Sequence, residues 1–300
     1  MRAQAPIIIS ASRATDIPAF YADWFFRRLE DGYAVWRNPY SGVPSYVSFQ
    51  NCRFIVFWSK NPKPLLPLLP QLKERGIGCY IQYTLNDYEG DGPEPNLPPL
   101  AERIETFKSL VDALGPGSVV WRFDPLVITD KLGIDELLDK IAGVAEQLKG
   151  YAEKLVFSFA DIGSYRKVGR NLETAGISYR EWDEQSMVEF ARRLSSLNRE
   201  RWGSRLATCS EAIALEEFDV EHNRCIDPEL IARLTGDPFL AAIGRDGGQR
   251  KLCGCALSKD IGAYNTCPHG CAYCYANTTP SSARATYLRH LNSPNLESII

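Results

Sequence analysis

Short and almost continuous apolar runs recur along the chain, and they alternate with longer segments of helical periodicity. Six runs have the length of a strand. They cover residues 7–10, 54–58, 78–84, 118–123, 155–159 and 205–209. A run that is apolar throughout is typical of a strand buried on both faces of a parallel sheet. The pattern therefore predicts alternating strands and helices joined by right-handed crossovers.

The segments between these runs complete the prediction. Helices are expected at residues 17–32, 65–75, 100–114, 134–148, 165–173, 184–197 and 228–234. Residues 33–37 and 46–49 flank a turn-rich loop and predict a hairpin inserted into the alternation. The loop through residue 99 that follows the third strand is rich in Gly, Pro, Asp and Asn, and it is long enough to be a lid or a disordered surface element.

Six strand–helix alternations predict an α/β fold, a partial (β/α)6 TIM-like barrel, over residues 1–240. Residues 241–300 would form a cysteine-rich iron–sulfur extension packed on the barrel mouth. A complete eight-strand barrel is the second possibility. A flat doubly wound sheet is the third, because no G-x-G-x-x-G turn follows any strand.

Composition narrows the class of protein. The chain has 300 residues, of which 45% are hydrophobic, so a substantial core is possible. Its net charge of −3 argues against a broad electrostatic surface for nucleic acid or anionic membrane, although a local basic patch, and hence a nucleic-acid partner, stays open. We expect neither a signal peptide nor a membrane-spanning segment, and therefore a cytoplasmic protein without a membrane partner.

Polar side chains follow each predicted strand, where a barrel enzyme carries its active site. The candidates for catalytic roles are Lys60, Arg122, Asp124 and Glu211. A cation just past an apolar strand is costly to desolvate unless an anion meets it. Lys60 and Arg122 would hold a ligand carboxylate or phosphate, or they would form structural ion pairs, Arg122 with Asp124 or Asp161 and Lys60 with Glu211 or Asp16.

Cysteines near the C-terminus give the most specific chemical signal. Cys267, Cys271 and Cys274 have the spacing C-x3-C-x2-C, and Tyr273 directly precedes the last of them. Three thiolates can hold three corners of a [4Fe–4S] cluster and leave one iron without a protein ligand. A zinc knuckle is the alternative, but structural zinc takes four ligands and its commonest spacing is two pairs.

This spacing resembles the C-x3-C-x-aromatic-C signature of radical S-adenosylmethionine (SAM) enzymes, which normally carry it near the N-terminus. With Cys253 and Cys255 and the segments 260–264 and 273–277, the C-terminal placement is similar to a bacterial family, defined by a domain of unknown function, with a radical-SAM-like cysteine cluster at its C-terminus. The segments at residues 12–18 and 57–62 fit the same family.

The resemblance implies that SAM binds the open iron and is cleaved to a 5′-deoxyadenosyl radical, with an electron donor such as flavodoxin or ferredoxin and a substrate that is not identified. It places Tyr273 beside the adenine. Arg13, Ser158 and Asp161, which lie at strand ends, are further candidates for contacting the cofactor. The chain has no recognisable counterpart of the family's Gly-Gly-Glu strand.

Four other cysteines predict a second metal centre. Cys209, Cys225, Cys253 and Cys255 would close either a second [4Fe–4S] cluster or a zinc site and pin the C-terminal segment over the barrel. The other two cysteines, Cys52 and Cys79, are interpreted as small buried apolar residues, and His269 as a residue that tunes the cluster or caps a turn.

Two other functions remain possible from the sequence. The protein would be an iron–sulfur redox or electron-transfer protein without SAM chemistry. Alternatively, it would be a zinc-stabilised barrel that binds a nucleotide or nucleic acid through Lys60, Arg122, Trp58 and Tyr83.

Overall fold

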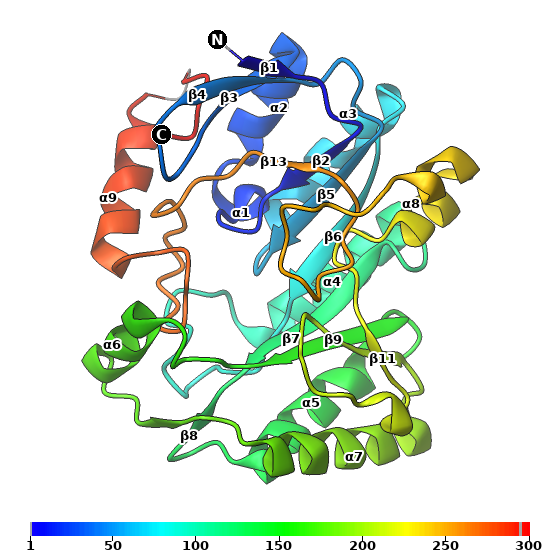
Figure 1. Cartoon of the computed structure of the whole chain (residues 1–300), viewed down its shortest axis with the longest axis vertical. Helices are drawn as coiled ribbons and strands as arrows, with labels where there is room; N and C mark the ends of the chain where they lie inside the picture. Colours follow the sequence, from blue (N-terminus) through cyan, green and yellow to red (C-terminus); the bar gives the residue numbers. More distant parts are fainter. Residues whose placement is uncertain (1, 294–295) are drawn as a thin grey trace.

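A parallel sheet of eight strands forms the centre of the computed structural model, which describes residues 2–293 and 296–300 (Figure 1). Its strand order is β12-β11-β9-β7-β6-β5-β2-β13, and every neighbouring pair is parallel. The strands are β2 (Ile8–Ala11), β5 (Phe54–Ser59), β6 (Gly78–Thr84), β7 (Val119–Leu126), β9 (Lys154–Phe159), β11 (Arg205–Thr208), β12 (Val220–His222) and β13 (Lys259–Asp260).

Both faces of this sheet are buried. On one face, Ile9, Ile55 and Ile81 belong to the large core between the sheet and the helices. On the other face, Phe54 and Tyr80 belong to a smaller core closed by residues that follow β12 and precede β13. Because both faces pack against apolar groups, the central strands are mostly apolar, and the six predicted strands are all present within a few residues of their expected bounds.

The prediction of a parallel α/β sheet is confirmed, but the predicted number of strands was too low. β12 and β13 have only three and two residues and are largely polar, so they carry no apolar run. From β2 to β12 the strands follow one another in chain order, and β13 lies on the far side of β2. This is the cyclic order of an eight-strand barrel, but β12 and β13 are edges, so the described part of the chain forms no closed barrel. A doubly wound sheet is ruled out because the order has no reversal between β2 and β12.

Nine α-helices are described in residues 2–293 and 296–300. They are α1 (Ile17–Phe20), α2 (Ala22–Asp31), α3 (Leu69–Glu74), α4 (Leu100–Leu114), α5 (Ile134–Leu148), α6 (Arg166–Thr174), α7 (Glu184–Arg201), α8 (Pro228–Thr235) and α9 (Pro280–Leu291). Short 3-10 helices lie at Lys63–Leu68, Glu216–Phe218 and Pro238–Ala242. None of the helices in this part of the chain combines the length and apolar character needed to cross a membrane.

Helix bounds differ from the prediction where prolines and turns interrupt the pattern. The predicted helix at residues 65–75 begins as a 3-10 helix containing Pro64 and Pro67, because proline removes a backbone donor. The helix expected after the first strand is divided at Tyr21 into α1 and α2. The sequence pattern did not predict α9.

The predicted hairpin is confirmed as β3 (Tyr33–Arg37) and β4 (Pro44–Ser48), which pair antiparallel. A third strand, β1 (Arg2–Gln4), pairs with β4 in parallel. A separate two-stranded ribbon joins β8 (Ile128–Thr129) to β10 (Tyr179–Arg180).

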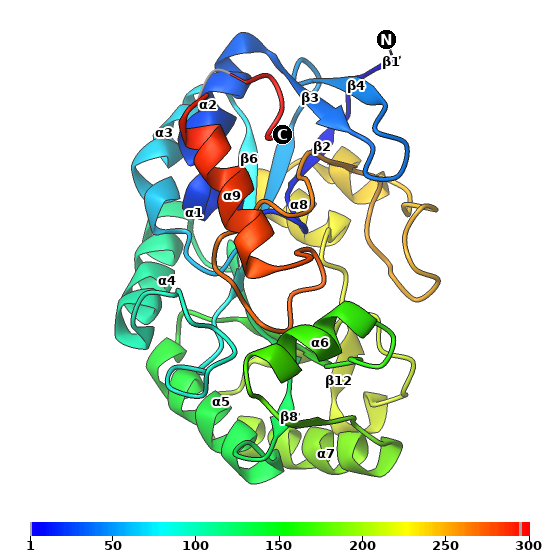
Figure 2. The same cartoon turned by 90° about the vertical axis from the view of Figure 1, so that its left-hand side faces the viewer.

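The C-terminal segment returns across the molecule to the first strand. β13 pairs with β2, and the backbone N–H of Ile261 donates to the carbonyl of Ser10 at 3.1 Å. Further along, α9 packs on α1 and α2, with the ring of His290 4.6 Å from that of Tyr21 (Figure 2). Residues 241–300 thus contribute a strand to the sheet as well as a helix on its outer layer.

A substitution at Gly262 tests how closely this segment approaches the residues that follow β2. A Cβ atom at Gly262 would lie 1.8 Å from Oγ of Ser12, so Gly262→Ala must displace one of the two segments. We expect the free energy of unfolding to fall by about 1–3 kcal/mol, the usual cost of overpacking, in urea denaturation. The matched control is Gly143→Ala in α5, where no neighbouring atom lies within 4 Å. It should stabilise the helix by about 0.5–1 kcal/mol. Equal stability of Gly262→Ala and wild type would contradict the close docking.

Candidate functional site

The carboxyl ends of the parallel strands meet at one edge of the sheet, here called the carboxyl edge, and several predicted site residues lie there together. Asp124 in β7 connects them. Its carboxylate accepts hydrogen bonds from Arg122 and Ser158, and it lies within electrostatic range of Lys60 and Glu211. The other three predicted catalytic candidates are therefore neighbours of the half-buried carboxylate of Asp124.

Arg122 forms the ion pair that the sequence suggested with Asp124. Its Nε lies 3.1 Å from Oδ2 of Asp124, and its Nη1 contacts Oε1 of Gln82 at 3.2 Å and Sγ of Cys225 at 3.3 Å. Burial opposes the charge on both partners. Arg122 nonetheless lowers the pKa of Asp124, and Cys225 and Asp124 together raise the pKa of Arg122. Arg122 thus neutralises Asp124 and also donates to a cysteine sulfur.

Lys60 also has a carboxylate partner, but neither of the two expected. Its Nζ lies 2.7 Å from Oε1 of Glu94 and 2.7 Å from the hydroxyl of Tyr273, which itself donates to Glu94. Burial acts against the charged form of Glu94, but Lys60 and the Tyr273 hydrogen bond together leave its pKa lowered. The expected pairing of Lys60 with Glu211 or Asp16 was wrong, although its backbone N–H does donate to Asp16 at 2.8 Å.

Glu94 was missed because it lies in the loop interpreted as a lid or a disordered element. In the structure this loop is part of the core. Asn86 and Tyr88 are buried, and Oδ1 of Asn86 accepts from the backbone N–H of Asp124 at 2.8 Å. Tyr88 donates to the carbonyl of Pro125 at 2.8 Å. The one sequence signal for Glu94 was its position between two prolines, which restrict the backbone on both sides.

The remaining candidates have separate surroundings. Glu211 accepts from the backbone N–H of Phe159 at 3.0 Å, and burial, with help from Asp124 and Cys209, raises its pKa to about 7. Asp161 is exposed and accepts from the backbone N–H of Ser164 at 3.2 Å. Three residues proposed to contact the cofactor, Ser158, Asp161 and Tyr273, are thus bonded to groups of the protein itself.

Buried polar contacts hold the segment of residues 266–275 against the carboxyl edge. Nε2 of His269 lies 2.8 Å from Oδ2 of Asp16, which is itself bonded to Ser59, and this hydrogen bond to His269 offsets the effect of burial and lowers the pKa of Asp16. The backbone N–H of Ala272 donates to the carbonyl of Pro93 at 2.9 Å. His269 is therefore buried and is not a turn residue in solvent. Its hydrogen bond to Asp16 helps to hold this segment against the carboxyl edge.

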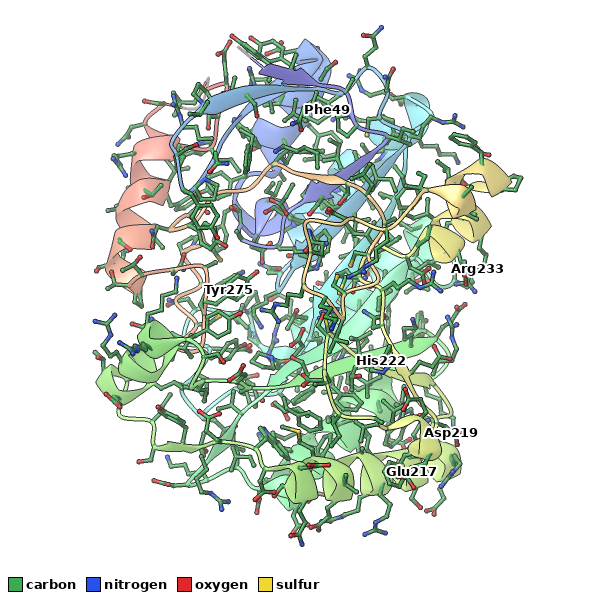
Figure 3. The ribbon with its side chains drawn as sticks, in the orientation of Figure 1. Phe49, Glu217, Asp219, His222, Arg233 and Tyr275 are labelled. Carbon is green, nitrogen blue, oxygen red and sulfur yellow. The ribbon has the colours of Figure 1, made fainter. Side chains whose placement is uncertain are left out.

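Two further details of this segment depend on tight geometry. Gly270 has φ +73°, and a Cβ there would lie 3.0 Å from Nδ2 of Asn96, which donates to the carbonyl of His269. Tyr275 donates to the carbonyl of Arg13 at 3.0 Å, and its side chain lies near α6, where its ring is 6.1 Å from that of Tyr165 (Figure 3).

The three thiols of Cys267, Cys271 and Cys274 come together in this segment. Each of the first two has a pKa raised mainly by burial and also by the neighbouring thiols, which shows that the three lie close enough to influence one another's ionisation. Lys60 acts in the opposite direction on Cys271 and favours its thiolate. A buried thiol of this kind loses its proton readily only when a metal ion or a nearby cation stabilises the thiolate.

The four other predicted ligands also come together, at a different place. Sγ of Cys209 lies 3.3 Å from Sγ of Cys225, and Cys253 and Cys255 pack in the same small core as these two residues. All nine cysteines are free of disulfides. Burial raises the pKa of both Cys52 and Cys79 to about 12, in agreement with their interpretation as apolar residues.

Within residues 2–293 and 296–300, no three His, Cys, Asp or Glu side chains are arranged so that they could hold a metal ion as they stand. The metal assignments of the seven cysteines remain predictions. What supports them is the chemistry of the donors, since thiolates are the ligands that iron–sulfur clusters and zinc prefer.

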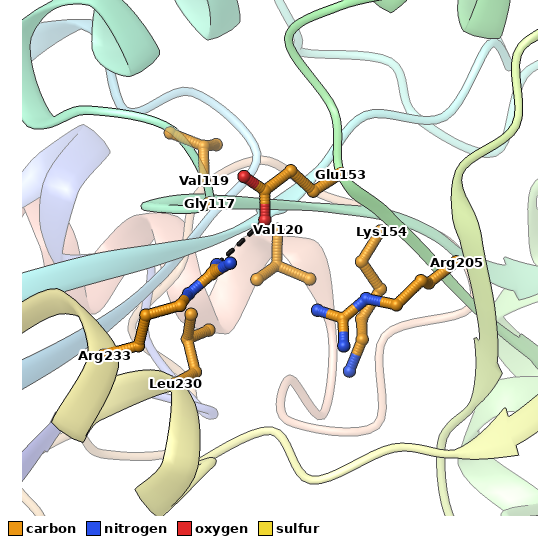
Figure 4. Close-up of a pocket in the computed structure, with 8 residues that line it drawn as sticks. All are labelled: Gly117, Val119, Val120, Glu153, Lys154, Arg205, Leu230 and Arg233. Carbon is orange, nitrogen blue, oxygen red and sulfur yellow. Dashed lines mark hydrogen bonds and ion pairs between the residues drawn. The ribbon is translucent and has the colours of Figure 1, made fainter.

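A pocket at the opposite, amino edge of the sheet has a different character. It lies between β7, β9 and α8 and is lined by Gly117, Val119, Val120, Glu153, Lys154, Arg205, Leu230 and Arg233 (Figure 4). Glu153 pairs with Arg233 at 2.8 Å across it. None of the predicted site residues lines this pocket.

The buried pair of Lys60 and Glu94 can be tested by substitution. Glu94→Gln leaves a buried ammonium group without its counter-charge, so we expect a loss of about 3–5 kcal/mol in urea denaturation. Adding Lys60→Met should restore part of it. In the folded protein the pKa of Glu94 lies below its ordinary value of 4.5, so ionised Glu94 stabilises the fold fully above that pH. The difference in stability between wild type and Glu94→Gln should therefore shrink as the pH falls below 4.5.

The control is the exposed pair of Lys63 and Glu102, 2.9 Å apart, where Glu102→Gln should change stability by less than about 1 kcal/mol. Equal losses from Glu94→Gln and Glu102→Gln would show that the buried pair does not stabilise the fold.

Comparison with known proteins gives one match. Residues 8–276 match the family model described as Domain of unknown function (DUF1848), which covers nearly all of the sheet, the carboxyl edge and both groups of cysteines. No curated protein and no solved structure matches the chain significantly. With more than half of its length matched, the chain belongs to the DUF1848 family.

Proposed function

We propose that this protein is a radical SAM-type enzyme, in which Cys267, Cys271 and Cys274 bind a [4Fe–4S] cluster at the mouth of a partial β/α barrel. Such a cluster, with one iron open to SAM, supplies the electron that cleaves SAM and so generates the radical that removes a hydrogen from a substrate. The substrate is not identified. The proposal places the protein in the cytoplasm, where thiols stay reduced, with a donor such as flavodoxin or ferredoxin.

One observation carries this proposal. The three thiols lie at the carboxyl edge, beside the polar ends of β5, β6 and β7, and not on the outer helices. The hydrogen bonds of Ala272 to Pro93, of His269 to Asp16 and of Tyr273 to Lys60 all support this position. Barrel-type enzymes bind their substrates at this edge of the sheet. A cluster bound there would meet the residues that line the sheet opening.

The surrounding residues suit a charged thiolate cluster. Burial disfavours free thiolates, so the cysteines would release their protons on metal binding. Lys60 then provides a cation beside Cys271. The thiol segment consists of turns without regular secondary structure, which leaves its side chains free to reorient around a cluster.

A neighbouring acceptor suggests a contact with SAM. Oε2 of Glu94 is buried and has no hydrogen-bond partner among residues 2–293 and 296–300, and Nη1 of Arg103 lies 4.0 Å from it. A buried carboxylate oxygen of this kind would accept strongly from an ammonium group. We assign Glu94 as the acceptor for the amino group of SAM. Tyr273, which donates a hydrogen bond to Glu94, would hold the carboxylate of Glu94 in position.

The experiment is anaerobic reconstitution with iron and sulfide, followed by SAM and dithionite. We expect about four irons at this site and formation of 5′-deoxyadenosine, both lost in the triple variant Cys267→Ala/Cys271→Ala/Cys274→Ala. Cys79→Ala, which removes a buried thiol from β6, is the control and should behave as wild type. The same iron content in the triple variant as in the wild type, or no 5′-deoxyadenosine above the variant's level from the wild type, would refute the proposal.

A further inference from the structure

The four cysteines outside the C-x3-C-x2-C segment lie where the sheet is open. Cys209 directly follows β11, Cys225 follows β12, and Cys253 and Cys255 precede β13. β12 and β13 are the two edges of the sheet, and they would be neighbours in a closed barrel. The four thiols therefore gather from both sides of this opening, which we call the seam.

The four cysteines pack together. The distance from Sγ of Cys209 to Sγ of Cys225 is 3.3 Å, and all four side chains belong to, or pack against, the smaller core on this face of the sheet. Four thiolates around a single zinc ion, with Zn–S bonds of about 2.3 Å, lie about 3.8 Å apart along the edges of the tetrahedron. The distance between Cys209 and Cys225 is close to this value, whereas a cubane cluster would have to push these two sulfurs much further apart.

The donors around these sulfurs suit thiolate ligands. Nη1 of Arg122 lies 3.3 Å and Nδ2 of Asn223 lies 3.4 Å from Sγ of Cys225, and the backbone N–H of Ile226 lies 3.4 Å from Sγ of Cys255. Arg13 also lies close enough to Cys255 for their charges to attract each other. Such N–H to sulfur bonds orient and stabilise metal-bound thiolates.

Charge gives a second argument. Four thiolates and one divalent ion carry a net charge of −2, which is costly to bury without counter-charges. Arg122, which is shared with Asp124, lies beside Cys225, and Arg13 lies near Cys255. Nη2 of Arg13 is buried without a hydrogen-bond partner among residues 2–293 and 296–300, although its guanidinium stacks 4.9 Å from the ring of Trp58. This unused donor lies on the side chain that already reaches Cys255.

We propose that Cys209, Cys225, Cys253 and Cys255 bind one zinc ion as a closed, redox-inactive site that clamps the seam of the sheet. Binding displaces the protons of the thiols that are still protonated and forms four zinc–sulfur bonds. The clamp takes the place of strand pairing between β12 and β13. It reinforces the backbone hydrogen bond from Ala256 to the carbonyl of Ile226, 2.9 Å long, which already crosses the seam.

This inference is independent of the cluster proposed for the other three cysteines. The test measures zinc and iron in the purified full-length chain by mass spectrometry. Wild type and the triple variant Cys267→Ala/Cys271→Ala/Cys274→Ala should each hold about one zinc per chain, and Cys225→Ser/Cys255→Ser should hold at least about tenfold less. The control Cys52→Ala/Cys79→Ala, which removes two buried thiols outside the group, should keep its zinc.

A second measurement does not depend on the folding of a variant. Co²⁺ exchanged into the wild-type chain should give the visible absorption of a tetrahedral thiolate complex, and removal of the metal by a chelator should raise hydrogen exchange at residues 220–226 and 253–260. A wild-type chain without zinc that gives no thiolate–cobalt absorption would overturn the inference. Four irons and four sulfides retained by the triple variant would also overturn it, because they would place a cubane cluster at the seam.

Discussion

Two buried carboxylates hold the distant parts of this chain together. Asp16 and Glu94 are both almost inaccessible to water, and a buried charge is stable only when partners surround it. Those partners come from both ends of the chain: Asp16 binds Ser59 and His269, and Glu94 binds Lys60 and Tyr273. Charge compensation at the carboxyl edge therefore fixes the position of the C-terminal cysteine segment together with the burial of Cys271, Ala272 and Tyr273 in the large core.

The same constraint gives the two groups of cysteines different surroundings. Near Cys271 the nearest cation is an ammonium group already paired with Glu94, so the thiols remain largely protonated in the protein alone. At the seam, Arg122 donates directly to Sγ of Cys225, and the pKa of Cys255 is lowered, chiefly by the neighbouring Cys225. Cysteines thus occur in two groups whose surrounding charges differ. This difference is one reason why we assign an iron–sulfur cluster to the C-x3-C-x2-C segment and zinc to the seam.

Ion pairing also limits what the polar residues of the carboxyl edge can do. Lys60 and Arg122 are candidates for binding an anionic ligand when seen in the sequence alone, but each is already neutralised by a carboxylate. They are better described as residues that shape and position the opening of the sheet. Glu211, with its pKa raised to about 7, is the candidate whose protonation changes near neutral pH.

The amino-acid sequence by itself determined the central strands and the helices α4 and α5, because burial on both faces of a sheet demands apolar runs and a helix packed on one side repeats its apolar residues every three to four positions. It also predicted that seven cysteines divide into two groups. Only the tertiary structure decided the partner of Lys60, the burial of the loop that carries Glu94, and the short edge strands β12 and β13. These features depend on contacts between residues far apart in the chain, and a polar residue has the same local pattern whether its partner is a buried charge or water.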